Sequence, residues 1–300
     1  MKLRMLLRIF FSLVLYCSLL VTSFLSFSIS SYSYNFYNKI IGGIVVPSSQ
    51  WKSAVALTDT RTGKMFCSGT LLTKELVVTA AHCLKSESFK NEEERIKYIR
   101  VYTGNGVEGG EFVGQYRVKI ARFHEKYCIY DNAWADIAIL VLENPVSREI
   151  SDTDLPPILS DLEEMANNLI VGRSVKLVGF GERNFINLAD FNDNRGGDTD
   201  NIRSNNKALS GIKYEVTVPI KYVSDKELIW DGSYSRGHYY GDSGGPVYIK
   251  LTNNTWKLVA IISRGYISTM EGIDILLANH ICWIQKNSGI LIPNIRNNCL

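Results

Sequence analysis

The sequence predicts an all-β protein in which short antiparallel strands close into barrels. Short apolar runs, rich in β-branched and aromatic residues, are separated by turn-forming Gly, Asn and Asp. These runs do not alternate with long helical patterns, as they would in a protein with a parallel sheet. The length of 300 residues allows one large domain or two barrels that share an interface.

The first half of the chain carries six predicted strands, which cover residues 55–57, 65–72, 76–79, 98–102, 112–120 and 137–142. A charged stretch at 85–97 predicts either a short helix or a solvated loop. Residues 147–169 are polar and contain Pro156 and Pro157, which stiffen a connection and cannot join a strand ladder. This segment therefore predicts the linker between two halves.

The second half carries four further predicted strands, which cover residues 173–181, 212–219, 247–251 and 256–263. Residues 182–207 are rich in Asn, Asp, Arg and Gly, a composition typical of a long exposed loop. Residues 278–286 predict a C-terminal helix with Trp283 and Ile284 on its buried face. Residues 288–300 predict a tail.

The N-terminal segment predicts export. Lys2, Arg4 and Arg8 precede a long apolar run at 9–29, the pattern of a secretory signal peptide over residues 1–30. We expect the mature protein to be secreted, to the extracellular space or the periplasm. The apolar run is also long enough to act as an uncleaved membrane anchor, so both readings stay open.

Charge and composition exclude other functions. The 33 Lys and Arg against 30 Asp and Glu give a net charge of +3, spread along the chain without a basic stripe. Nucleic acid is therefore not an expected partner. No Cys-x-x-Cys or His-Glu-x-x-His pattern predicts a metal site. We expect neither a metal nor another cofactor.

The segment from Gly241 to Pro246, Gly-Asp-Ser-Gly-Gly-Pro, predicts a nucleophile on a sharp turn. Its glycines free the backbone to bend tightly, and the N–H groups of Gly241 and Ser243 can point at one spot. An acyl-transfer enzyme needs this combination of an attacking hydroxyl and two donors for an oxyanion. His82, at the end of an apolar run, is the candidate base. Asp136, a lone carboxylate before an apolar strand, is the candidate orienting acid.

Beyond these three residues, the chain resembles the trypsin/chymotrypsin family of serine proteases, the S1-type peptidases. The matching segments run in family order, at residues 40–43, 66–70, 79–83, 136–140, 179–181, 241–246 and 263–265. The resemblance implies two six-stranded antiparallel Greek-key barrels with a short C-terminal helix. The protease domain would cover 40–287, with one barrel at about 40–150 and the other at about 170–277.

The resemblance also implies roles for single residues. Ser243, His82 and Asp136 would form the catalytic triad, with Gly241 and Ser243 as oxyanion donors. Residues 31–39 would be a short activation peptide. Cleavage after Lys39 would free the amine of Ile40 to pair with Asp242. A buried carboxylate without a partner is costly, so an arriving cation could reorganise the turn around the nucleophile.

The cysteines fit an oxidising compartment. In the resembled family the counterparts of Cys67 and Cys83 are bonded, a bridge worth roughly 3 kcal/mol in the chain-entropy model. Cys128, Cys282 and Cys299 remain in the mature segment. We expect one bond among them, between Cys128 and either Cys282 or Cys299.

The primary specificity pocket is the least determined part. Gly237 stands where trypsin-like members have an aspartate. Gly265 and Gly272 match positions where glycine keeps the pocket open, which favours a large apolar or aromatic substrate side chain. Asp274, two residues after Gly272, would instead draw in Lys or Arg if it faces inward. His238 would favour an acidic residue.

Ser263 opens the segment that forms another wall of this pocket. Two family cysteines that brace the pocket walls are replaced here by Tyr239 and Trp230. These replacements weaken the pocket alignment without affecting the triad.

The function implied is a secreted serine endopeptidase, made as a zymogen and acting on proteins or peptides. An activating protease is a further expected partner, and we expect a monomer. One alternative is a catalytically silent, protease-like binding protein, and another is a signal-anchored surface protein. His124, His238 and His280 lack a catalytic sequence setting and are expected to be structural or surface residues.

Overall fold

A computed structural model describes residues 42–107, 110–128, 130–181, 211–232, 236–266, 269 and 271–295. The expected signal peptide, the expected activation peptide with Lys39, Ile40, and the expected loop 182–207 lie outside these residues. Within them, no helix is long and apolar enough to cross a membrane.

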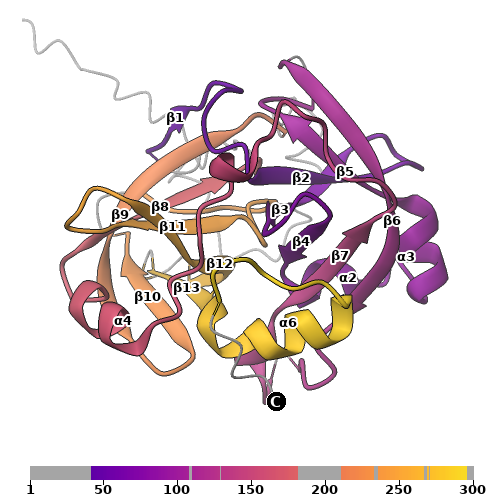
Figure 1. Cartoon of the computed structure of the whole chain (residues 1–300). Helices are drawn as coiled ribbons and strands as arrows, with labels where there is room; N and C mark the ends of the chain where they lie inside the picture. The colour runs from indigo at the N-terminus through magenta and orange to yellow at the C-terminus, as the bar shows by residue number, and fades with distance from the viewer. Residues whose placement is uncertain are drawn as a thin grey trace, which may run out of the picture. The chain divides into compact units, whose positions relative to one another are not determined.

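The first barrel contains six strands in the closed antiparallel order β2-β3-β4-β7-β6-β5 (Figure 1). Their bounds are β2 (Ala54–Asp59), β3 (Met65–Leu71), β4 (Leu76–Thr79), β5 (Ile99–Gly104), β6 (Phe112–Phe123) and β7 (Ala138–Leu142). Strands β2, β4 and β7 are buried along their whole length, so apolar residues follow one another in them instead of alternating with polar ones.

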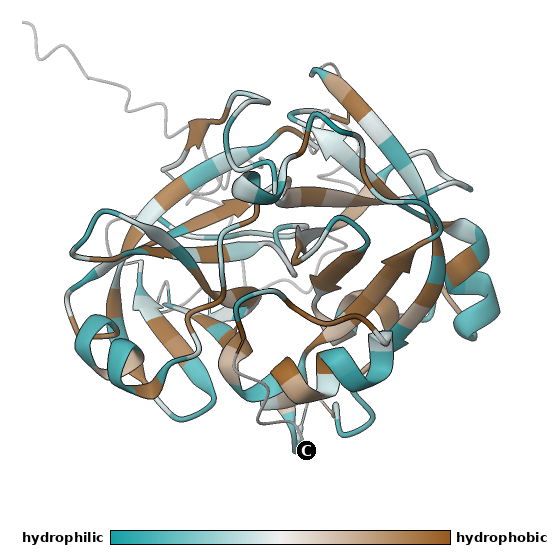
Figure 2. Cartoon of the chain, viewed as in Figure 1, coloured by the Kyte–Doolittle hydropathy of each residue, from teal (hydrophilic) through white to brown (hydrophobic). Residues whose placement is uncertain are grey.

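The second barrel also contains six strands, because β9 pairs with both β8 and β10 while β11 pairs with both β8 and β12. Their bounds are β8 (Ser174–Gly179), β9 (Tyr214–Val223), β10 (Glu227–Asp231), β11 (Pro246–Lys250), β12 (Trp256–Tyr266) and β13 (Glu271–Leu276). The short β1 (Ile44–Val45) pairs with β9. Buried residues alternate with partly or fully exposed ones along most of β9, and Figure 2 shows bands of differing hydropathy on the strands. The predicted pair of six-stranded barrels is confirmed.

Short helices connect and flank the barrels. They are α2 (Ala81–Leu84), α3 (Glu92–Tyr98), η1 (Ala133–Ala135), η2 (Asp152–Asp154), α4 (Leu162–Asn168), η4 (Leu277–His280) and α6 (Ile281–Ser288). Helix α3 decides between the two expectations for the charged stretch at 85–97, and the Asn91 side chain caps it. Helix α6 confirms the short C-terminal helix, and Ile284 on it is fully buried.

The linker 147–169 contains a helix that its polar composition did not predict. Helix α4 begins after Asp161, whose carboxylate accepts a bond from the Glu164 N–H. The spacing of Asp161 and Glu164 is that of a helix N-terminus, a signal present in the sequence.

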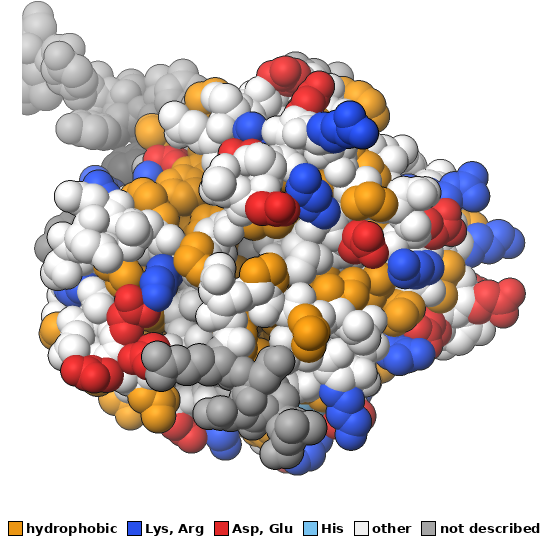
Figure 3. Space-filling view, viewed as in Figure 1, with side chains coloured by type: hydrophobic (Ala, Val, Ile, Leu, Met, Phe, Trp, Pro, Cys, Tyr) orange, Lys and Arg blue, Asp and Glu red, His pale blue; other side chains and the backbone are white. Residues whose placement is uncertain are grey.

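Each barrel has an apolar core of its own, and a third apolar cluster spans both barrels. A single cluster of buried side chains includes Ala54 and Ile139 from the first barrel with Tyr248 and Ile261 from the second. Hydrogen bonds also cross the interface: the Ser68 N–H donates to the Ser243 carbonyl at 2.9 Å. Strand β3 therefore fixes the loop that carries the candidate nucleophile. On the face shown in Figure 3, acidic and basic side chains are interspersed.

The cysteines differ in part from expectation. Cys67 and Cys83 form a disulfide, as the resemblance implied. Cys128 is free, so the expected bond from Cys128 to Cys282 or Cys299 is wrong. Cys282 is disulfide-bonded, and its partner sulfur lies outside the described residues.

Candidate active site

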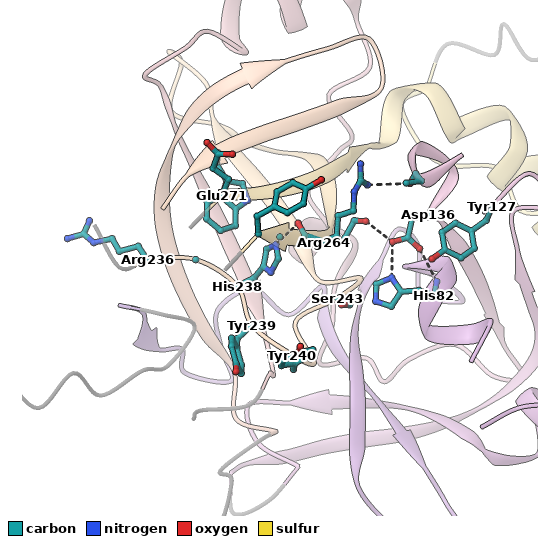
Figure 4. Close-up of a pocket in the computed structure, with 16 residues that line it drawn as sticks. His82, Tyr127, Asp136, Arg236, His238, Tyr239, Tyr240, Ser243, Arg264 and Glu271 are labelled. Atoms are coloured by element: carbon teal, nitrogen blue, oxygen red, sulfur yellow. Dashed lines mark hydrogen bonds and ion pairs between the residues drawn. The ribbon is translucent and has the colours of Figure 1, made fainter. Parts of the chain in front are cut away.

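His82 and Asp136 are brought together by strand pairing. Strand β4 pairs with β7 so that Thr79 lies opposite Ala138. His82 follows β4 on helix α2, and Asp136 precedes β7. The two Asp136 oxygens accept separate bonds, one from the His82 backbone N–H at 2.9 Å and one at the ring Nδ1 at 2.8 Å. This double contact sets the orientation of the imidazole ring (Figure 4).

Asp136 lies in a buried, strongly hydrogen-bonded setting. Its side chain is 4% exposed, whereas that of His82 is 35% exposed. Ser263 donates its hydroxyl to Asp136 Oδ2 at 2.6 Å. Burial alone would raise the pKa of Asp136, but the His82 charge and the bonds from His82 and Ser263 lower it overall. The carboxyl therefore stays ionised beside the imidazole.

Ser243 lies on a turn whose glycines are required by geometry. Gly241 and Gly244 have φ angles of 92° and 81°, in the left-handed region. A Cβ on Gly244 would lie 2.1 Å from the Thr79 hydroxyl and 2.5 Å from the Ser68 carbonyl. Ser243 and His82 line the same pocket (Figure 4).

The backbone around Ser243 leaves two donors available. The carbonyls of Gly241 and Ser243 accept bonds from the Ser68 hydroxyl and the Ser68 N–H, both at 2.9 Å. Within the described part of the chain, the N–H groups of Gly241 and Ser243 donate to no backbone acceptor. Two such donors beside a hydroxyl can stabilise an oxyanion that forms when the hydroxyl attacks a carbonyl.

Asp242 is fully buried in a cradle made by two glycines. Its oxygens accept backbone bonds from Gly181 and Tyr239, both at 2.8 Å. A Cβ on Gly179 would lie 2.2 Å from Asp242 Oδ1, and one on Gly181 would lie 2.7 Å from its carboxyl carbon. Burial raises the pKa of Asp242 to about 7. No cation among the described residues forms an ion pair with it, and the expected partner Ile40 lies outside them.

The candidate triad opens into a cavity of about 410 Å³. Four residues expected in the substrate pocket line it, namely Gly237, His238, Ser263 and Gly265. Gly272 and Asp274 do not line it. Aromatic side chains that include Tyr127, Tyr240 and Tyr266 complete much of the wall.

Trp230 is the pocket residue whose role was not predicted. Its indole N–H donates to Asp274 Oδ2 at 2.9 Å, and Asp274 is 0% exposed. The Asp274 carboxyl thus bonds to the indole instead of facing a substrate. The replacement of a family cysteine by Trp230 was the signal in the sequence.

His124 and His280 pack in an aromatic cluster with Trp134 and Trp283. His124 stacks on Trp283 at 4.9 Å between ring centroids, and His280 stacks on Trp134 at 6.0 Å. Among described residues, the group close enough to hold a metal is Cys67, His82 and Cys83. The disulfide occupies both sulfurs and leaves only the His82 ring.

Two antiparallel barrels with a histidine, an aspartate and a serine lining one pocket are typical of the trypsin-like class. The family model described as Trypsin matches residues 40–283, so this chain belongs to the trypsin family. This membership supports a serine protease, with protein as the general class of substrate.

Two curated relatives are distant. The chain is 24% identical to the clotting factor G beta subunit of Tachypleus tridentatus, over 83% of this chain and 79% of that protein. It is 26% identical to ovochymase of Halocynthia roretzi, over 84% of this chain. The match covers only 15% of ovochymase.

Proposed function

We propose that this chain is a secreted serine endopeptidase that hydrolyses peptide bonds through His82, Asp136 and Ser243. The observation that carries the proposal is the pair of hydrogen bonds that Asp136 accepts from His82, in a pocket that Ser243 also lines. A buried, ionised carboxylate bonded to one ring nitrogen leaves the other nitrogen to accept a proton.

In the proposed reaction, Ser243 Oγ attacks the carbonyl carbon of the scissile bond while His82 Nε2 removes the hydroxyl proton. The oxyanion receives bonds from the N–H groups of Gly241 and Ser243. His82 then protonates the leaving amine and the C–N bond breaks, which leaves an ester on Ser243. A water molecule, deprotonated by His82, hydrolyses this acyl-enzyme. Asp136 stabilises the imidazolium in both halves of the reaction.

We further propose that the chain is made as a zymogen cut after Lys39. The buried Asp242, with two backbone bonds and no described cation beside it, supports this. Desolvation makes a lone buried carboxylate costly, so a new ammonium at Ile40 would be drawn to it. The ion pair would fix the orientation of the two peptide bonds that flank Asp242. One of them carries the Ser243 N–H, and the other adjoins Gly241.

The proposed route to the substrate follows from the N-terminal segment. Residues 1–30 would direct export, 31–39 would be removed on activation, and a second protease would make that cut. The domain 40–287 would act as a monomer on protein or peptide substrates. The similarity to a clotting factor subunit and to ovochymase supports this route.

Reaction with a fluorophosphonate probe tests the proposal. The full-length protein, the protein cut after Lys39, and a Lys39→Gln variant would be labelled in parallel, with Ser243→Ala as the control. We expect rapid labelling of the cut protein, weak labelling of the other two, and none of Ser243→Ala. An unlabelled cut protein would instead favour a catalytically silent binding protein, and full labelling of Lys39→Gln would rule out the zymogen step.

A further inference from the structure

The Trp230 side chain fills the space beside two glycines of the expected substrate pocket. Trp230 on β10 lies opposite Gly272 on β13. A Cβ on Gly272 would lie 1.9 Å from Trp230 Cζ2, and one on Gly237 would lie 2.3 Å from Trp230 Cη2. The indole therefore fills the space that both glycines leave empty, and it is only 3% exposed.

His238 closes a second part of the same slot. Its ring meets the Trp230 indole edge to face at 5.1 Å, and its Nε2 lies 3.2 Å from the Arg264 carbonyl oxygen. A Cβ on Gly265 would lie 3.1 Å from His238 Cε1. The imidazole thus reaches across to the wall that Gly265 forms.

The two ionisable groups packed against the indole, Asp274 and His238, offer no charge to a substrate. Of the charged side chains that line the cavity, Arg264 pairs with Glu227 and Glu271 with Lys221. The Asp274 carboxyl is shut off behind the indole, to which it is bonded at 2.9 Å, and burial raises its pKa well above the usual range. Burial lowers the pKa of His238 to about 4, so the imidazole is neutral near pH 7. Neither group can act as the fixed counter-ion that selects Lys, Arg or an acidic residue.

The geometry points to Trp230, with His238 beside it, as the residue that sets primary specificity by filling the pocket. The site would accept a peptide whose residue before the scissile bond is small and uncharged, such as alanine. This inference rests on the proposed endopeptidase function. It replaces the earlier expectation of an open slot for a large apolar side chain.

Peptide amides that differ only in Ala, Phe or Lys before the scissile bond test this inference. With the protein cut after Lys39, we expect the highest kcat/KM for Ala. Trp230→Ala empties the slot and should raise the ratio of kcat/KM for Phe over Ala at least about tenfold, since one methylene in a pocket changes rates roughly 10- to 200-fold. Trp230→Phe retains most of the ring volume without the N–H and should keep the preference for Ala. Such a result would separate filling of the slot from the bond to Asp274.

The fluorophosphonate rate of each protein reports the fold and the nucleophile independently of the slot. An unlabelled wild-type protein would refute the proposed function. A labelled wild-type protein that cleaves the Phe or Lys peptide faster than the Ala peptide would refute the role of Trp230 alone. Should Trp230→Ala not fold, the wild-type profile and the smaller change Trp230→Leu, with the same expected direction, decide the question.

Discussion

Replacing Ser68 by alanine should lower the reactivity of Ser243, although Ser68 itself does not line the pocket. Ser68 is on β3 of the first barrel and is 0% exposed. Its hydroxyl donates to the Gly241 carbonyl at 2.9 Å and accepts from the Phe180 N–H at 3.0 Å. One side chain of the first barrel therefore positions two segments of the second barrel.

The magnitude follows from the two groups left without a partner. Each buried polar group that loses its hydrogen bond costs about 1–3 kcal/mol, so Ser68→Ala should lower the free energy of unfolding by about 2–6 kcal/mol. Loss of a whole oxyanion donor costs about 10²–10³ in rate. A loosened Gly241 is a partial loss, and we expect the fluorophosphonate rate constant to fall about 10- to 100-fold.

Ser53→Ala is the matched control for this measurement. Ser53 is also 0% exposed, and its hydroxyl bonds to that of Tyr248 at 2.6 Å across the same barrel interface. Urea unfolding should show a loss of about 1–3 kcal/mol for Ser53→Ala, because only Tyr248 loses its partner. Its labelling rate should equal that of the wild type. Equal labelling rates for Ser68→Ala and the wild type, or an equal fall of the labelling rate in both variants, would refute the reasoning.

Three further predictions concern the same loop and its surroundings. Gly244→Ala should abolish labelling and lower the free energy of unfolding by about 3 kcal/mol, because the added Cβ would lie 2.1 Å from the Thr79 hydroxyl. Urea unfolding measures the change in stability. The pKa of Asp242 is raised by burial to about 7, so the folded uncut chain binds more protons than the unfolded one between about pH 4 and pH 7. Its stability should therefore fall by up to about 4 kcal/mol across that window, and Asp242→Asn should remove the slope. Burial lowers the pKa of Lys213 to about 7, so the unfolded chain binds more protons than the folded one above that pH. Stability should therefore rise from about pH 7 to pH 10, and this rise should be absent in Lys213→Met.

The barrel architecture was readable from the sequence because most strands are apolar runs between turn residues. Strands β10 and β13 were not predicted. Only three apolar residues lie between the acidic ends of β10, and Asp274 interrupts β13, which also contains Gly272, a residue that disfavours a strand by itself. The pairing of these strands with each other and with their neighbours overrides the local preference.

The pairing of His82 with Asp136 was also foreseeable, since both residues flank apolar strands of one barrel. The contact of Ser263 with Asp136 was not. The register of β12 against β13 shifts between Ile262 and Arg264, directly at Ser263. Such an irregularity changes the direction of a side chain, and its position depends on how the partner strand pairs. The sequence of β12 alone therefore does not reveal it.

Glycine explains why the tight turn around Ser243 could be read from the sequence while the interior of the pocket could not. At Gly244 the constraint is the backbone itself, since its φ angle of 81° and the close Thr79 hydroxyl both demand the missing side chain. At Gly272 the missing side chain only creates a space, and a sequence motif does not say which group enters it. Here the cross-strand neighbour Trp230 enters, as aromatic rings often do over a glycine on a paired strand. A pocket defined by glycines is thus open only where no neighbouring strand supplies a ring, and β10 supplies one.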